Sequence, residues 1–275
     1  MTNLFNYIDR PSPIHRLTGA TKLCCLLLWS LSGMITFDTR LLVFLTAGGV
    51  IVFFVSKIRF SDISVLLWLM LVFMSLNNVL VFLFSPLHGV ELYGTRHDLF
   101  RLSARYTVTA EQLFYHLNLG LKYLAMMPLV ILFVSTTNPS EFAASLNKLG
   151  VKYSVAYSVA LALRYIPDVQ REYHEISQAQ QARGIEMSKK ASLVQRLRSA
   201  SSILIPLILS SMEKIEVVSN AMELRSFGKN KKRTWYMGRP FRTADIASMV
   251  FCVLLVALAL ALNHINGSRF YNPFI

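Results

Sequence analysis

Two arginines stand out in this 275-residue sequence because each lies near the predicted end of a long helix. Arg183 directly precedes Gly184, and Arg225 comes three residues before Gly228. Glycine commonly ends an α-helix, and a cation in the last turn interacts favourably with the helix dipole. That effect does not explain why similar small-residue surroundings occur twice. Because a guanidinium is always charged and carries a rigid fork of donors, such a helix tip suits a buried carboxylate pocket on another protein.

Two catalytic chemistries can be tested against the sequence, and both fail. A phosphate-binding loop of the form G-x-x-x-x-G-K-[ST] is missing, because Gly228-Lys229 is followed by asparagine. A zinc protease motif fails because Gln178 occupies the place of the second histidine after His174. We therefore expect no catalytic, metal or cofactor site and predict that the chain is not an enzyme.

The composition indicates a membrane protein. The chain is 54% hydrophobic and 16% charged, against about 25% charged residues in soluble globular proteins. Its mean hydropathy of +0.46 excludes a disordered protein. A secreted disulfide scaffold is excluded by the small number of cysteines, which all lie in apolar runs: Cys24, Cys25 and Cys252. We expect no cleavable signal peptide, because the first 16 residues mix charges with two prolines.

Five apolar stretches approach or reach the length of about 20 residues that a helix needs to cross a bilayer. They lie at about 17–37, 41–60, 65–84, 117–135 and 246–262. We therefore predict an all-α integral membrane protein with about five transmembrane helices. Lys22 and Lys122 lie within two of these stretches, and we expect both to extend toward the interface. Asn77 and Asn78 are costly in lipid, so we expect hydrogen bonds between helices, with partner docking as the alternative.

The basic residues predict how these helices are oriented, because cytoplasmic segments carry an excess of Lys and Arg. Most of the 28 Lys and Arg residues fall in segments 1–22, 57–62 and 136–242, on one predicted side. The other side holds Arg40, Arg96, Arg101, Arg105 and Arg269. We expect a multi-pass protein of a prokaryotic cell membrane with its N-terminus in the cytoplasm and its C-terminus outside. The net charge of +13 has the same origin, and no pattern indicates nucleic-acid binding.

These features predict three regions. Residues 1–135 form a membrane region with four spans, residues 136–242 form a large cytoplasmic segment, and residues 243–275 form the final transmembrane helix and an outer tail. The cytoplasmic segment contains a short amphipathic helix ending at Gly150 and two long helices, with a kink or a restart of the helix expected at Pro167. The long helices run from about 153 to 184 and from about 193 to 227, and each begins with an apolar portion: Val155–Leu163 and Ile203–Leu209.

Four motifs in this segment, taken in order, carry a resemblance to a known family. They are Thr136-Thr137 with Ser140-Glu141; Leu161-Ala162-Leu163-Arg164-Tyr165-Ile166-Pro167; Ala179-Gln180-Gln181-Ala182-Arg183-Gly184; and Ala221-Met222-Glu223-Leu224-Arg225 with Arg233-Thr234 after it. Together they resemble the transmembrane (T) component of energy-coupling factor (ECF) transporters, of the EcfT/CbiQ type.

The resemblance implies a four-part importer. Two cytoplasmic ABC-type ATPases would hydrolyse ATP, and a separate membrane protein, the S component, would bind a vitamin or a transition-metal ion. This chain would be the coupling and scaffold subunit that connects them in the bilayer, with 136–242 as its coupling helices. The S component would select the substrate, so the sequence does not name it.

The resemblance also implies roles for particular residues. The ATPase-coupling residues would be Ala182, Arg183, Gly184, Leu224, Arg225 and Ser226, with each arginine entering an acidic groove on one ATPase. Residues supporting this segment would be Arg164, Pro167, Gln180, Glu223 and Arg233. Contact with the S component would involve Ala156, Ala160, Ile203 and Leu207, or these side chains pack the two long helices together. The second motif of the family usually reads Ala-Arg-Gly or Ala-Arg-Ala, so Leu224 and Ser226 are a departure.

Two other classes of function remain as alternatives. A self-sufficient secondary transporter or channel would carry charged residues at mid-span and internal repeats. The five stretches are nearly free of such charges, and no repeat is apparent. An intramembrane enzyme would need a nucleophile with a base, or metal ligands, at membrane depth, and no such set is apparent.

Overall fold

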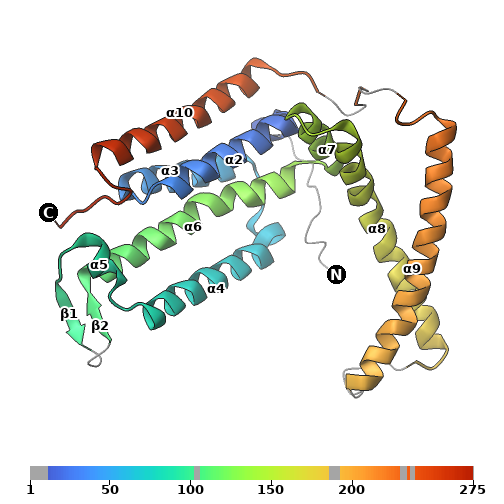
Figure 1. Cartoon of the computed structure of the whole chain (residues 1–275), viewed down its shortest axis with the longest axis horizontal. Helices are drawn as coiled ribbons and strands as arrows, with labels where there is room; N and C mark the ends of the chain where they lie inside the picture. Colours follow the sequence, from blue (N-terminus) through green and yellow to red (C-terminus); the bar gives the residue numbers. More distant parts are fainter. Residues whose placement is uncertain (1–11, 102–105, 186–192, 230–233, 236–238, 275) are drawn as a thin grey trace. The chain divides into compact units, whose positions relative to one another are not determined.

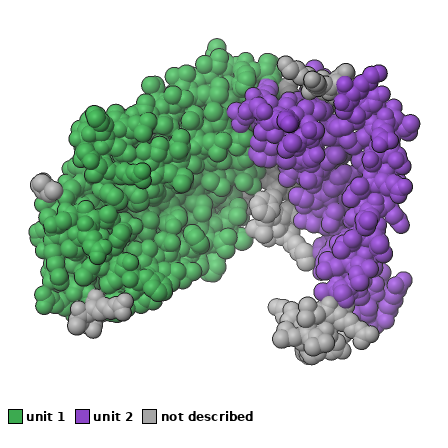
Figure 2. Space-filling view, viewed as in Figure 1, with its two compact units in different colours: residues 1–138, 239–275 green, residues 139–238 purple. Residues whose placement is uncertain are grey.

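The computed structural model describes residues 12–101, 106–185, 193–229, 234–235 and 239–274. The chain divides into two compact units, coloured green and purple in Figure 2. Unit 1 comprises Met1–Asn138 and Arg239–Ile275, and unit 2 comprises Pro139–Gly238. Both are built from helices, with one small β-hairpin in unit 1. The prediction of an all-α membrane protein is confirmed apart from that hairpin.

Unit 1 contains seven helices and two strands among its described residues. Figure 1 labels all of them except α1. The helices are α1 (Pro13–Arg16), α2 (Gly19–Ile35), α3 (Thr39–Val55), α4 (Phe60–Phe84), α5 (His88–Tyr93), α6 (Ala110–Thr136) and α10 (Thr243–Ile265). Strands β1 (Asp98–Arg101) and β2 (Thr107–Thr109) pair antiparallel. The sequence patterns had not predicted α5 or the hairpin, which connect α4 to α6.

Helices form at all five predicted spans. Among the described residues, three helices are long and apolar enough to cross a membrane: Ile63–Phe84, Ala110–Thr136 and Thr243–Ile265. Helices α2 and α3 have 17 residues each, the lower end of the spanning range. Helix α6 begins seven residues before the predicted start at 117, because Thr109 caps it by accepting a hydrogen bond from the backbone of Gln112.

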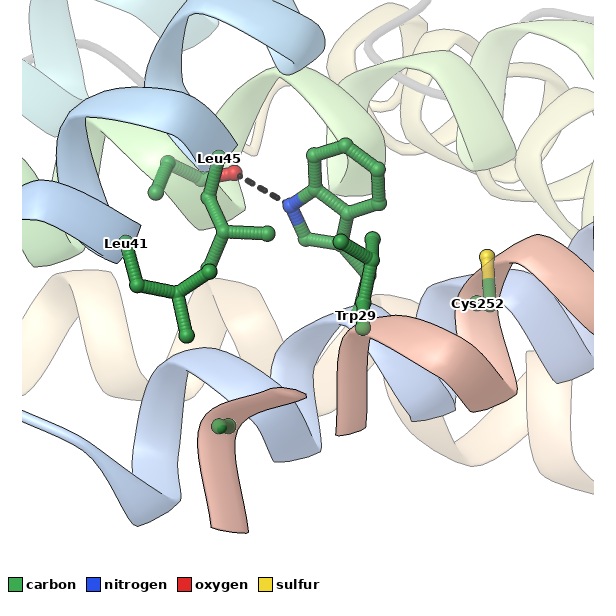
Figure 3. Close-up of a cluster of buried hydrophobic side chains, with 7 residues drawn as sticks. Trp29, Leu41, Leu45 and Cys252 are labelled. Carbon is green, nitrogen blue, oxygen red and sulfur yellow. Dashed lines mark hydrogen bonds between the residues drawn. The ribbon is translucent and has the colours of Figure 1, made fainter. Parts of the chain in front are cut away.

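The core of unit 1 lies where α2, α3, α6 and α10 meet around Trp29 (Figure 3). The indole Nε1 of Trp29 donates a hydrogen bond of 3.1 Å to the carbonyl oxygen of Ala125 on α6. Leu45 of α3 and Cys252 of α10 belong to the same buried cluster. Glycine at position 48 is required by this packing, since a Cβ there would lie 2.9 Å from the tryptophan ring.

Charged and polar side chains hold the ends of the apolar helices. Lys22 is only 7% exposed, and its Nζ donates a 2.8 Å hydrogen bond to the carbonyl oxygen of Thr136, the last residue of α6. Lys22 therefore binds a helix terminus within unit 1, and its expected extension toward the interface stays a prediction. Lys122 makes a similar contact, with its Nζ 3.3 Å from the carbonyl oxygen of Met34 and over the ring of Phe37. A cation at a helix C-terminus is favoured by the helix dipole.

Polar residues inside the spans also pair between helices. The amide oxygen of Asn78 on α4 lies 2.9 Å from Nδ1 of His116 on α6. The predicted hydrogen bond between helices is confirmed for Asn78. This contact satisfies two polar groups that would be costly to leave unpaired in lipid.

Unit 2 contains α7 (Pro139–Lys148), α8 (Tyr153–Ala182) and α9 (Leu193–Leu224). Helices α8 and α9 run in opposite directions and cross, as Figure 1 shows. Helix α7 packs on α8 with small residues, and Ala143 and Ala156 are fully buried. Helix α8 is continuous over 30 residues with Pro167 inside it, so the helix does not restart there.

Replacing Gly48 with alanine tests the close packing around Trp29. In an open helical site this change gains up to about 1 kcal/mol of helix propensity. At Gly48 we expect overpacking, which typically costs about 1–3 kcal/mol, to outweigh that gain and lower the melting temperature in detergent. Gly120→Ala on α6 is the matched control, because nothing lies within 4 Å of its added Cβ. Equal melting temperatures for the two variants would contradict this packing.

Candidate functional site

The end of α8 is a complete Schellman motif that presents Arg183. The backbone N–H of Gly184 donates to the carbonyl of Gln181 (3.0 Å), and that of Ile185 donates to the carbonyl of Gln180 (3.1 Å). Gly184 has a φ of +83°, a left-handed conformation that glycine adopts without steric cost. Arg183 is the C-cap residue and is exposed. Its side chain has no ion pair within the described part of the chain.

The end of α9 repeats the same motif with serine in place of glycine. The backbone N–H of Ser226 donates to the carbonyl of Glu223 (2.8 Å), and that of Phe227 donates to the carbonyl of Met222 (2.9 Å). Ser226 has a φ of +52° and so takes the position that Gly184 holds at the end of α8. Arg225 is therefore the structural equivalent of Arg183, and it is also exposed.

This correspondence shows how the second motif keeps its geometry although Leu224 and Ser226 replace the usual small residues beside the arginine. The backbone geometry is kept, and the substituted serine occupies the left-handed region that disfavours residues with a Cβ. Leu224 is 88% exposed, so its bulk lies beside the arginine without burying it. The sequence pattern had placed the end of α9 near Phe227, ahead of Gly228; α9 ends at Leu224 because Ser226 breaks it first. Aligning Ser226 with Gly184 would have located this end.

The antiparallel arrangement places the two arginines at opposite ends of the helical pair. Near the end of α8, the side-chain amide of Gln180 donates to the carbonyl of Ser202 (3.1 Å). At the other end, the ring of Phe227 lies 4.5 Å from that of Tyr157 near the start of α8. Ser202 thus marks the level of the end of α8 on α9, and Arg225 follows Ser202 by 23 residues. At 1.5 Å per residue, the two arginines are roughly 35 Å apart.

A charged groove lies at the middle of this helical pair, and hydrogen bonds between its lining side chains keep the helices in register. It has a volume of about 630 Å³ and is lined by residues of both helices, including Asp168, Glu172 and Lys214. Nζ of Lys214 on α9 donates a 2.7 Å hydrogen bond to Glu172 on α8, and Ser210 donates to the same carboxylate. The ammonium of Lys214 lowers the pKa of Glu172. The stabilisation is therefore present above the ordinary pKa of a glutamate and is lost as the pH falls through the lowered pKa.

Comparison with known proteins shows which family the chain belongs to. A family model described as Cobalt transport protein (CbiQ) matches residues 10–236, which is most of the chain.

The chain belongs to this family.

Its relatives carry the name Energy-coupling factor transporter transmembrane protein EcfT. The protein of Streptococcus thermophilus is 24% identical over 273 residues, covering 95% of this chain and 97% of that protein. The protein of Streptococcus equi subsp. equi is 25% identical and covers 92% and 93%, respectively. The protein of Exiguobacterium sibiricum is 30% identical over 156 residues, where this chain spans 58% of its length. The resemblance to ECF T components is confirmed.

The other residues predicted for the coupling segment differ in how exposed they are. Arg164, Pro167, Ala182 and Glu223 are exposed on the helical pair. Gln180 is partly buried by its bond to α9. Arg233 lies outside the described residues.

The four residues proposed to contact an S component lie mostly inside unit 2. Ala156 is fully buried, Ile203 is 1% exposed and Leu207 is 9% exposed, while Ala160 is half-buried. Their burial agrees with the alternative that the sequence left open, in which these side chains pack the two long helices together.

The apolar portion Ile203–Leu209, which the sequence singled out at the start of the second long helix, also has residues on the opposite face. Leu204, Ile205, Ile208 and Leu209 are all exposed on α9. Their spacing of one, three and four residues places them on one helix face, opposite Ile203 and Leu207, so helical periodicity contained the signal. Among the described residues, no group of three or more His, Cys, Asp or Glu side chains could hold a metal ion.

Exchanging the two terminating residues tests the equivalence of the two helix ends. Gly184→Ser places a Cβ in a left-handed backbone, which we expect to cost about 1–2 kcal/mol. Ser226→Gly removes the same strain, so we expect no loss of stability. Hydrogen exchange of the last turns of α8 and α9 measures both effects locally. A loss of protection of similar size in both variants would contradict the equivalence.

Proposed function

We propose that this T component couples two cytoplasmic ABC-type ATPases to a membrane-embedded S component of an ECF importer. The observation that carries the proposal is the repeated helix end: two exposed arginines at equivalent C-caps, roughly 35 Å apart by the helical rise. Because the same helix end with an exposed arginine occurs twice, it suits binding to two copies of one partner or to two similar partners. The printed names of the relatives, transmembrane proteins of ECF transporters, support membership in such a complex.

Each arginine would enter an acidic groove on one ATPase. The guanidinium can bind a carboxylate through two parallel hydrogen bonds, which transmits both force and orientation. The Schellman ends fix the backbone behind each arginine, so little conformational freedom is lost when a partner binds. ATP hydrolysis would take place in the ATPases, and this chain would contribute no catalytic residue and need no cofactor.

The exposed apolar face of α9 would bind the S component. Leu204, Ile205, Ile208 and Leu209 supply a contiguous apolar surface on the first half of the helix. Ala156, Ile203 and Leu207 support that surface from inside unit 2. The S component would select the substrate, a vitamin or a transition-metal ion.

The distribution of basic residues supports a cytoplasmic position for the coupling helices, residues 136–242. It also supports an N-terminus in the cytoplasm and a C-terminus outside, in a prokaryotic cell membrane. Residues 1–135 would form the membrane region with four spans, and residues 243–275 the last span and an outer tail.

Arg183→Ala tests the coupling role most simply. Removing one partner of a desolvated charge pair costs about 2–5 kcal/mol, so we expect at least a roughly 30-fold loss of ATPase affinity. Arg183→Lys should also be defective, since a point charge cannot replace the fork. The measurement is affinity purification of the tagged chain in mild detergent, with quantification of the nucleotide-binding subunits retained.

Arg171→Ala is the matched control for this experiment. Arg171 is an exposed arginine on the same helix, and it pairs with Asp168 at 2.5 Å. We expect this variant to retain the ATPases at the level of the unmodified chain. A chain that purifies alone, or an Arg183→Ala variant that retains both ATPases fully, would contradict the proposed function.

A further inference from the structure

One turn at the start of α2 contacts the two helices at which the chain leaves unit 1 and returns to it. Unit 2 begins at Pro139, three residues after α6 ends at Thr136, and α10 begins at Thr243, five residues after unit 2 ends. Lys22 binds the last residue of α6, where the first connection starts, and Thr18 binds the first turn of α10, where the second connection ends. All of these residues belong to unit 1.

The first contact is made by a buried cation. Nζ of Lys22 lies 2.8 Å from the carbonyl oxygen of Thr136, at the C-terminus of α6. The last carbonyls of a helix lack partners within the helix and carry partial negative charge. The side-chain hydroxyls of Thr136 and Thr137 are buried and have no hydrogen-bond partner among the residues that the structure describes. The amine of Lys22, rather than these hydroxyls, thus joins the end of α6 to α2.

The second contact is made by a buried carboxylate. Asp245, in the first turn of α10, is 1% exposed. Its Oδ1 accepts a 2.8 Å hydrogen bond from the backbone N–H of Thr18, and its Oδ2 accepts one of 2.8 Å from that of Arg242. One side chain therefore caps α10 and joins it to the start of α2.

The two contacts are mechanically linked. The backbone N–H of Lys22 donates a 3.0 Å hydrogen bond to the carbonyl of Thr18, so both residues belong to the same helical turn. A displacement of either connection therefore acts on one short, hydrogen-bonded segment. That segment leads directly into the Trp29 cluster, in which α2, α3, α6 and α10 pack together.

We propose that the turn Thr18–Lys22 transmits movement of the coupling helices to the membrane helices, with Lys22 and Asp245 as positioning residues. This inference rests on the proposed function, because it needs an ATP-driven movement of unit 2. The entry and the exit of unit 2 would pull on the same turn of α2. Helix α2 would then carry the displacement into the core of unit 1.

Hydrogen exchange of the purified complex tests this transmission. The complex of this chain with its co-purified ATPases is measured without nucleotide and with ATP plus vanadate as the probe. In the unmodified complex we expect the nucleotide to change exchange both in 139–238 and in α2, α6 and α10. In Lys22→Met we expect the change to persist in 139–238 and to be lost in α2, α6 and α10. Lys22→Arg, which keeps the cation and its donors, should restore the change.

Lys122→Met is the matched control, because Lys122 binds a carbonyl at the opposite end of α2 and contacts neither connection. We expect this variant to keep the change in the membrane helices. The inference is overturned if Lys22→Met still passes the change to α2, α6 and α10, or if Lys122→Met abolishes it equally. If the nucleotide changes nothing in 139–238 of the unmodified complex, or if no ATPase co-purifies, the proposed function itself fails.

Discussion

An α-helix leaves backbone groups without partners at both of its ends, and a bilayer offers no water to satisfy them. Within unit 1 this constraint is met by charged side chains placed at helix termini. Lys22 binds the end of α6, and Lys122 binds the end of α2. Asp38 accepts a hydrogen bond from the backbone of Arg40 in the first turn of α3, and Asp245 accepts one from the backbone of Arg242, the N-cap residue of α10. These contacts satisfy the backbone groups at the helix ends and also join neighbouring helices. The polar ends thereby position the helices that form the apolar core.

In unit 2 the unpaired carbonyls at the helix ends are satisfied by the backbone instead, and that difference leaves the arginines exposed. The C-termini of α8 and α9 satisfy their own carbonyls through Schellman motifs at Gly184 and Ser226. The side chains of Arg183 and Arg225 are then not needed to complete the helix ends. The Glu172–Lys214 pair and the Tyr157–Phe227 contact hold the helices in an antiparallel register that separates these tips.

Much of this arrangement follows from residue patterns that act locally. Apolar length predicts five of the helices in unit 1, and Gly184 predicts the end of α8, because each depends on a short stretch of sequence. The burial of Lys22 was not predictable in this way, since it depends on a carbonyl 114 residues away. The inward orientation of Ile203 and Leu207 depends on how α9 meets α8. Ser226 was missed because serine rarely adopts a positive φ, and only its correspondence with Gly184 indicates one.

A structure of the purified complex would test the central claim most directly, through the surroundings of the two guanidinium groups. The account predicts that Arg183 and Arg225 each lie within hydrogen-bond distance of a carboxylate, on two different nucleotide-binding subunits. Guanidinium groups that lie free in solvent, or that contact only lipid headgroups, would contradict it.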